Sequence, residues 1–219
     1  MTTPGKITLW GRKSSANVQK VLWTLAELSL PYEHIPAGGD FGGLGDPAYL
    51  AMNPNGRIPT LRDGDLVVWE SDAIVRYLAA RYGAGTLWPV DPAERAIADQ
   101  WMTWGTTELE VDWLWLFWRL VRTPPSKRDP QAIARHLEAT VARFQLLDRH
   151  LQGRNYLAGT ALTIADIPAG MTLYRWYAMD IQRPDTPNVD AWYARLKERP
   201  AYRAGICIPF DELVGKESF

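Results

Sequence analysis

The first 83 residues alternate short apolar runs with turn-forming residues, a pattern typical of a small β-sheet with covering helices. Strands are predicted over residues 6–10, 32–35, 58–62 and 66–69. The last two flank Asp63-Gly64, which is a strong hairpin signal. The pattern therefore predicts a sheet of four strands, two of them joined as a hairpin.

Apolar residues at helical spacing lie between and after these strands. They predict helices over 17–29 and 71–82 and a short one over 47–52, with Ser71 as the N-cap of the last helix and Gly83 just past its end. A helical crossover joins the first two strands, so those strands are expected to be parallel. The order β-α-β-(α)-β-β-α is that of a thioredoxin-like sheet. The Cys-x-x-Cys motif is missing, so any thiol chemistry would have to come from a bound ligand.

From residue 93 onward the apolar positions follow a helical period almost throughout. Helices are predicted over 93–120, with a kink near Gly105, over 131–152, from Ile164 onward and from Pro187 onward. The stretch 84–92 carries a glycine and two prolines and is interpreted as a linker. The sequence thus predicts an α/β thioredoxin-like domain over 1–83 and an all-α domain over 93–219.

Composition narrows the classes of function. Of 219 residues, 47% are hydrophobic and 22% charged, enough to bury a full core. The net charge of -1 argues against nucleic acid as the main partner, since phosphate binding needs a basic excess. No apolar run suits a membrane span and no signal peptide is visible, so a cytoplasmic location is expected. A single cysteine, Cys207, and three scattered histidines exclude an internal disulfide and offer no metal motif.

Four segments together carry a family resemblance. They are residues 7–21, 53–61, 70–74 and 163–167, which include Asn53-Pro54-Asn55-Gly56-Arg57-Ile58-Pro59 and Glu70-Ser71. In this order, and over nearly the whole chain, they resemble the cytosolic glutathione S-transferase superfamily. The turn at 10–18 lacks tyrosine, so the chain is similar to the serine-type branch of theta- and nu-like bacterial enzymes. The resemblance implies glutathione as co-substrate, a role in detoxification, and a homodimer in which domain 1 of one subunit meets domain 2 of the other.

Glutathione chemistry requires a site that ionises a thiol. A thiol with a pKa near ~8.5 is only about 3% thiolate at pH 7, and lowering that pKa by about 2 units takes roughly 2.7 kcal/mol of stabilisation. Ser15 lies at the start of the first helix, where its hydroxyl and the helix dipole both favour S⁻, and Asn17 can add an amide donor. Plain N-capping by the serine is the alternative, and Ser14 is the rival donor.

The resemblance assigns the two ends of glutathione to further residues. The Ile58-Pro59 bond is expected to be cis, so that the backbone of Ile58 pairs with the cysteinyl residue. Glu70 is expected to pair with the γ-glutamyl amine, and Ser71, at a helix N-terminus, to hold the γ-glutamyl carboxylate. Arg57 is a candidate for the glycyl carboxylate, although a solvated surface arginine is an equal interpretation.

Aromatic residues on the 93–120 helix suggest the second substrate site. Trp104 and Trp113 are the candidates for an aromatic wall, with Tyr174 and Trp176 as further ones; core packing is the alternative for each. Asp166 is interpreted as a helix-capping residue rather than a catalytic acid. Nothing near Cys207 suggests an activated nucleophile.

These observations predict a glutathione transferase whose thiolate attacks a small apolar electrophile, without a metal or redox cofactor. A glutathione-dependent disulfide-bond reductase or peroxidase of the nu-like kind is the nearer alternative, favoured by the pairing of Ser15 with Asn17. A non-catalytic glutathione-binding or regulatory protein is the alternative from another class. Glu70-Ser71 and Ile58-Pro59 argue against a loss of glutathione binding.

Overall fold

A four-stranded mixed sheet forms the first part of the chain. The computed structural model describes residues 6–217. The strands are β1 (Ile7–Trp10), β2 (Tyr32–Ile35), β3 (Thr60–Asp63) and β4 (Leu66–Trp69), in the spatial order β2-β1-β3-β4. β1 and β2 pair in parallel, whereas β3 is antiparallel to β1 and to β4. The predicted strands, the parallel pair and the hairpin are all confirmed.

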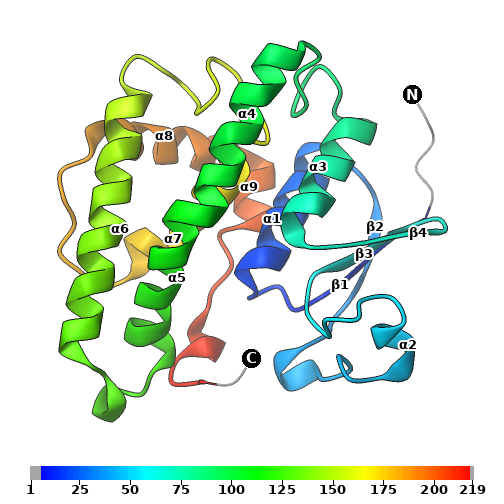
Figure 1. The fold of residues 1–219 in the computed structure, drawn as a ribbon, viewed down its shortest axis with the longest axis horizontal. Helices are drawn as coiled ribbons and strands as arrows, with labels where there is room; N and C mark the ends of the chain where they lie inside the picture. The colour runs from blue at the N-terminus through cyan, green and yellow to red at the C-terminus, as the bar shows by residue number, and fades with distance from the viewer. Residues whose placement is uncertain (1–5, 218–219) are drawn as a thin grey trace.

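Three helices accompany this sheet, namely α1 (Ala16–Glu27), α2 (Pro47–Leu50) and α3 (Ser71–Tyr82). The apolar stripes of α1 and α3 bury Val21, Leu25, Ile74 and Leu78 against Leu9 and Leu61 of the sheet. In Figure 1, α1 lies between the sheet and the helical half of the molecule. The N-terminus of α1, which follows directly on β1, therefore opens between the two halves.

Within the described residues, six α-helices build the second half: α4 (Pro92–Trp104), α5 (Glu110–Phe117), α6 (Pro130–Leu151), α7 (Asp166–Ala178), α8 (Pro187–Glu198) and α9 (Pro200–Gly205). The predicted helix over 93–120 is interrupted by π-helical turns at Gly105–Leu109 and Trp118–Arg122. A Cβ on Gly105 would lie 3.0 Å from the Cβ of Pro168, so the glycine lets α7 approach closely at the expected kink. Among residues 6–217, no helix is both long and apolar enough to cross a membrane.

Two predicted element starts and one predicted N-cap are wrong. β3 begins at Thr60 rather than Ile58, after the buried Pro59, which has no N–H for a ladder. The N-cap of α3 is Glu70, with φ 68° and ψ 120°, so that Ser71 is the first helical residue. α7 begins at Asp166 rather than Ile164, because the preceding residues form a tight turn.

The two halves share buried residues. Trp23 belongs to α1 but is fully buried in the core of the helical half, where its ring meets Tyr202 edge-on with centroids 4.9 Å apart. A Cβ on Gly205 would lie 2.6 Å from the backbone nitrogen of Trp23, so α9 touches α1 closely. This packing fixes the position of α1 relative to the helical half.

Candidate functional site

The hydroxyl of Ser15 is free of a capping role. Ser15 occupies the N-cap position of α1, with φ -77° and ψ 125°, but its side chain makes no capping hydrogen bond. Its carbonyl accepts the Gln19 N–H at 2.9 Å, so the backbone starts the helix without help from the hydroxyl. The Ser14 hydroxyl is instead buried, with no partner among residues 6–217. Of the two serines, Ser15 is therefore the one that offers a partly exposed donor at the positive end of α1.

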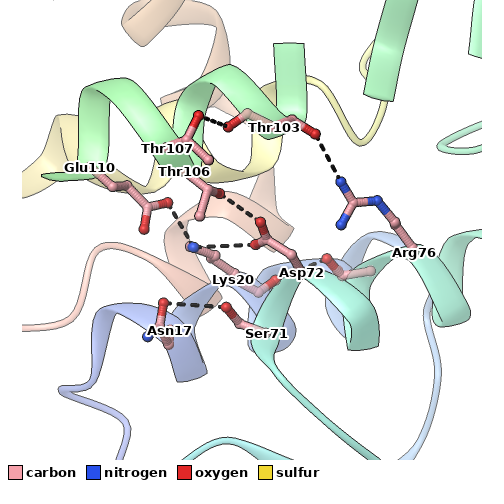
Figure 2. A network of polar contacts seen from close by, with 10 residues as sticks. Asn17, Lys20, Ser71, Asp72, Arg76, Thr103, Thr106, Thr107 and Glu110 are labelled. Carbon is pink, nitrogen blue, oxygen red and sulfur yellow. Dashed lines mark hydrogen bonds and ion pairs between the residues drawn. The ribbon is translucent and has the colours of Figure 1, made fainter. Parts of the chain in front are cut away.

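Asn17 and Ser71 meet across the gap between α1 and α3. The Ser71 hydroxyl donates to the Asn17 amide oxygen at 3.2 Å, as Figure 2 shows. This bond orients the amide so that its NH₂ group remains available to a ligand. Glu70 precedes Ser71 with its exposed side chain on a left-handed backbone, a strained conformation that concentrates at functional sites. The structure thus brings Ser15, Asn17, Glu70 and Ser71 to the facing N-termini of two helices.

The loop before β3 presents the backbone of Ile58. The Ile58-Pro59 bond is cis. The Arg57 carbonyl accepts hydrogen bonds from the Tyr49 hydroxyl at 2.7 Å and the Asn53 amide at 2.8 Å, which hold the loop. The Arg57 side chain is exposed and forms no ion pair within the described residues. The backbone groups of Ile58 form no backbone hydrogen bond in this part of the chain, so they are open to a peptide ligand.

A buried charge network lies beneath the site (Figure 2). The Lys20 ammonium is 2.7 Å from a Glu110 oxygen and 3.3 Å from an Asp72 oxygen, and Thr106 donates to the other Asp72 oxygen at 2.6 Å. Burial lowers the pKa of Lys20, but the two carboxylates more than offset it and leave that pKa raised. Burial raises the pKa of Glu110 to about 7. The charge of Asp72 adds to this rise, whereas Lys20 opposes it. The network joins the helical half to the residue that follows Ser71.

The aromatic residues that were predicted to line the second substrate site do not lie together in the structure. Thr103, Thr106 and Glu110 face the N-terminal half, whereas Trp104 packs against Trp101, with ring centroids 5.3 Å apart. Trp101 in turn stacks on a histidine of α6, which puts Trp104 on a different face of α4 from the site residues. The structure therefore does not bring Trp104 to the side of α4 that faces Ser15.

Trp113 is 1% exposed and belongs to the helical core, where it stacks on Phe117 at 5.7 Å. Phe117 meets Phe210 of the C-terminal segment at 5.3 Å, and Tyr174 meets Phe210 at 6.3 Å. Trp176 is stacked in the core on Phe144. Phe117 is itself only 1% exposed, so the partly exposed aromatic residues of this group are Tyr174 and Phe210, and the sequence analysis did not single out Phe210.

Two arginines at the Ser14–Ser15 turn were also missed. Arg175 is 2% exposed on α7, and its Nη2 atom donates to the Ser14 carbonyl at 2.6 Å. The Arg12 carbonyl accepts the Ser15 N–H at 3.1 Å, so Arg12 belongs to the same turn. Burial lowers the pKa of Arg175 to about 9, and the charge of Arg12 adds to the effect. An arginine in the otherwise apolar stripe of a helix was the available sequence signal.

Asp166 and Cys207 lie away from this site. Asp166 accepts the Leu157 N–H at 2.9 Å and the Thr163 N–H at 3.1 Å, the second of which is the expected capping contact. Burial raises the pKa of Asp166 to about 7. Burial also raises the pKa of the half-buried Cys207 thiol, which opposes nucleophilic activation. Within residues 6–217, no group of three His, Cys, Asp or Glu side chains is arranged to hold a metal ion.

Comparisons with known proteins identify the family of this chain. The family model for the glutathione S-transferase N-terminal domain matches residues 9–86, and that for the C-terminal domain matches residues 107–200. Glutathione S-transferase GstB of Escherichia coli is 46% identical over 205 residues, which are 93% of this chain and 99% of that protein. Glutathione S-transferase D6 of Drosophila melanogaster is 32% identical over 87% of this chain and 86% of its own. The chain therefore belongs to the glutathione S-transferase family.

A solved structure gives the same result for the fold. The theta-class glutathione S-transferase of Xanthomonas axonopodis pv. citri, determined with glutathione bound, is 47% identical. It superposes with a TM-score of 0.89 and covers 94% of this chain and 99% of its own. The thioredoxin-like domain followed by an all-α domain is thus the architecture of this family, and the resemblance to the theta-like branch is confirmed.

Proposed function

We propose that this protein is a glutathione transferase in which Ser15 and Asn17 stabilise the thiolate of bound glutathione. The observation that carries the proposal is the uncommitted Ser15 hydroxyl at the N-terminus of α1, beside an Asn17 amide that Ser71 orients. Two neutral donors and the helix dipole favour the anion over the neutral thiol. The glutathione-bound relative from Xanthomonas supports the choice of ligand.

The proposed pose of glutathione follows the described groups. The cysteinyl backbone pairs with the open N–H and C=O of Ile58. The γ-glutamyl carboxylate meets the free N–H groups of the first turn of α3, and Glu70 receives the γ-glutamyl amine. Ser71, the first residue of α3, belongs to this carboxylate site, and its hydroxyl also orients the Asn17 amide. Arg57, exposed on the same loop as Ile58, is the candidate for the glycyl carboxylate.

In the proposed reaction, the thiol loses its proton to water and the thiolate attacks an electrophilic carbon. A sulfur–carbon bond forms while the bond to the leaving group breaks, and the leaving group departs with the electron pair. Phe210 and Tyr174, which are both partly exposed, provide the aromatic surface for the electrophile. Lowering the thiol pKa from ~8.5 to below ~7 raises the thiolate fraction at neutral pH more than tenfold.

The test is a panel of a chloronitrobenzene, a dialkyl disulfide and a hydroperoxide with purified protein. We expect conjugation of the chloronitrobenzene, with kcat/KM at pH 6.5 reduced about 10- to 100-fold in Ser15→Ala/Asn17→Ala. Ser126→Ala, an exposed serine in a remote loop, is the matched control. Turnover confined to the disulfide or the hydroperoxide would establish the reductase or peroxidase alternative. Glutathione binding without turnover of any of the three would establish the non-catalytic one.

We also propose a homodimer. Trp69 on β4 and Ile97 on α4 are exposed apolar residues on either side of α3, a position suited to a second subunit. Sedimentation of the intact chain at micromolar concentration is expected to give twice the mass of 24.8 kDa.

A further inference from the structure

Arg175 is a buried cation without a carboxylate partner. It is 2% exposed, and among residues 6–217 no Asp or Glu oxygen lies within 4.0 Å of its guanidinium. Its Nη2 atom donates to the Ser14 carbonyl, while its Nε atom has no partner in this part of the chain. Its guanidinium lies over Phe117, 4.8 Å from the ring centroid, and 5.6 Å from that of Phe210. The Arg175 guanidinium therefore contacts the Ser14–Ser15 turn on one side and the rings of Phe117 and Phe210 on the other.

Arg12 places a second cation on the open side of the same turn. Its side chain passes along Gly38 and Gly39 and forms no ion pair within the described residues. Its nearest acidic neighbours are Glu212 and Asp40, and Asp40 is itself paired with Lys216 at 2.5 Å. Burial lowers the pKa of Arg12, which these two carboxylates only partly oppose. Two guanidinium groups thus flank the turn that carries Ser15, and neither forms an ion pair within the described residues.

A small cavity lies beside Arg12. It has a volume of about 70 Å³ and is lined by Arg12, Phe41, Arg122 and Lys216, together with Asp40 and Glu212. The C-terminal segment forms one wall of it, where Gly215 donates to the Val121 carbonyl at 2.9 Å and Lys216 pairs with Asp40. Figure 1 shows this segment running between the two halves, close to the start of α1. The cavity has room for a carboxylate but not for a second large apolar group.

We propose that the electrophile of this enzyme carries a carboxylate, which binds to Arg12 in the field of the buried Arg175. This inference rests on the proposed function and narrows its substrate class from apolar electrophiles to anionic ones. The aromatic or alkyl body of the substrate lies against Phe210 and Tyr174, and the carboxylate points to Arg12. Arg175 is a positioning residue, because it holds the Ser14 carbonyl and contributes charge from below without reaching the substrate. A planar guanidinium binds a carboxylate with two parallel hydrogen bonds, which also orients the reacting carbon.

The glycyl carboxylate of glutathione is the other anion that Arg12 could bind, so the experiment separates the two. It uses 4-chloro-3-nitrobenzoate and the matching neutral amide as electrophiles for the intact enzyme. In each reaction the thiolate forms a bond to the ring carbon and chloride leaves with the electron pair, while the carboxylate or amide is unchanged. The measured quantity is the ratio of kcat/KM for the benzoate to that for the amide, compared between variants so that intrinsic reactivity cancels.

Arg12→Gln is expected to lower this ratio at least tenfold, the size of effect usual for one charge-assisted contact. Arg12→Lys is expected to recover part of the loss, and Arg135→Gln, an exposed arginine on α6, is the matched control. An unchanged ratio in Arg12→Gln would overturn the proposal. A raised KM for glutathione with the amide, at a constant ratio, would instead assign Arg12 to the glycyl carboxylate and equally overturn it. If the wild-type enzyme binds glutathione but converts neither chloroarene, the proposed function fails, and this inference with it.

Discussion

Replacing Lys20 with methionine tests the charge network that connects the helical half to the site. The Lys20 side chain is 1% exposed, and its ammonium lies 2.7 Å from Glu110 and 3.3 Å from Asp72. At an effective dielectric constant of about 20, these attractions are worth roughly 6 and 5 kcal/mol, against a desolvation cost of several kcal/mol per ion. Methionine is similar in size to lysine but leaves two largely buried carboxylates, with side chains 17% and 13% exposed, without their cation.

The expected loss of unfolding free energy is about 3–5 kcal/mol, the usual result of removing one partner of a buried ion pair. Glu110→Gln removes one of the two carboxylates that Lys20→Met leaves without a cation. Lys20→Met/Glu110→Gln is therefore expected to be more stable, by at least about 1.5 kcal/mol, than the sum of the two single losses predicts. Thr106 still donates to Asp72 in the double variant.

Urea unfolding monitored by circular dichroism provides the stabilities, and calorimetry provides the affinity for glutathione. Because Asp72 follows Ser71, Lys20→Met should weaken glutathione binding as well as stability. Leu147→Ala, a fully buried truncation in α6 remote from the site, should cost a comparable ~2–5 kcal/mol without affecting affinity. A loss below about 1 kcal/mol in Lys20→Met, or strict additivity in the double variant, would refute the reasoning.

Three further predictions concern single residues. Glu70→Ala should weaken glutathione binding about tenfold or more in calorimetry, since a charge-assisted contact is worth ~1.5–3 kcal/mol; unchanged affinity would remove Glu70 from the site. Burial raises the pKa of Asp166 from 3.8 to about 7, so the folded protein holds this proton more tightly than the unfolded chain does. Stability should therefore fall as pH rises between these values, by up to ~1.4 kcal/mol per pH unit, and Asp166→Asn should show a smaller slope in urea unfolding at pH 4.5, 5.5 and 6.5. Gly205→Ala should cost at least ~2 kcal/mol, because its Cβ would lie 2.6 Å from the backbone nitrogen of Trp23, and an unchanged melting temperature would contradict that packing.

Local patterns account for what the sequence predicted well. The hairpin at Asp63-Gly64 and the apolar faces of α1 and α6 depend on residues that are close together in the sequence. The structure contains the hairpin and both helices. The order of short motifs along the chain was enough to indicate the family. Ser15 was singled out because its hydroxyl lies at a helix start, whereas Ile58 and Glu70 were singled out from the family resemblance.

Long-range contacts account for what the sequence could not show. The fold brings the Ser71 hydroxyl, which is predicted to hold the γ-glutamyl carboxylate, to Asn17, 54 positions earlier in the chain, and the sequence analysis did not predict that contact. Arg175 reaches Ser14 across 161 positions, and no local pattern encodes that contact. Trp104 faces away from the site because α4 packs between α6 and the N-terminal half. Hydrophobic periodicity alone does not determine which face of α4 meets which neighbour.

The thiol pKa of bound glutathione tests the central claim most directly. Ultraviolet titration near ~240 nm, where the thiolate absorbs, measures this pKa in the enzyme–glutathione complex. The account predicts a value below ~7 for the wild-type protein and a value near that of the free thiol, ~8.5, for Ser15→Ala/Asn17→Ala, with each single variant between them. A double variant that binds glutathione and keeps the low thiol pKa would contradict the account and place the donor elsewhere, with Ser14 the first candidate.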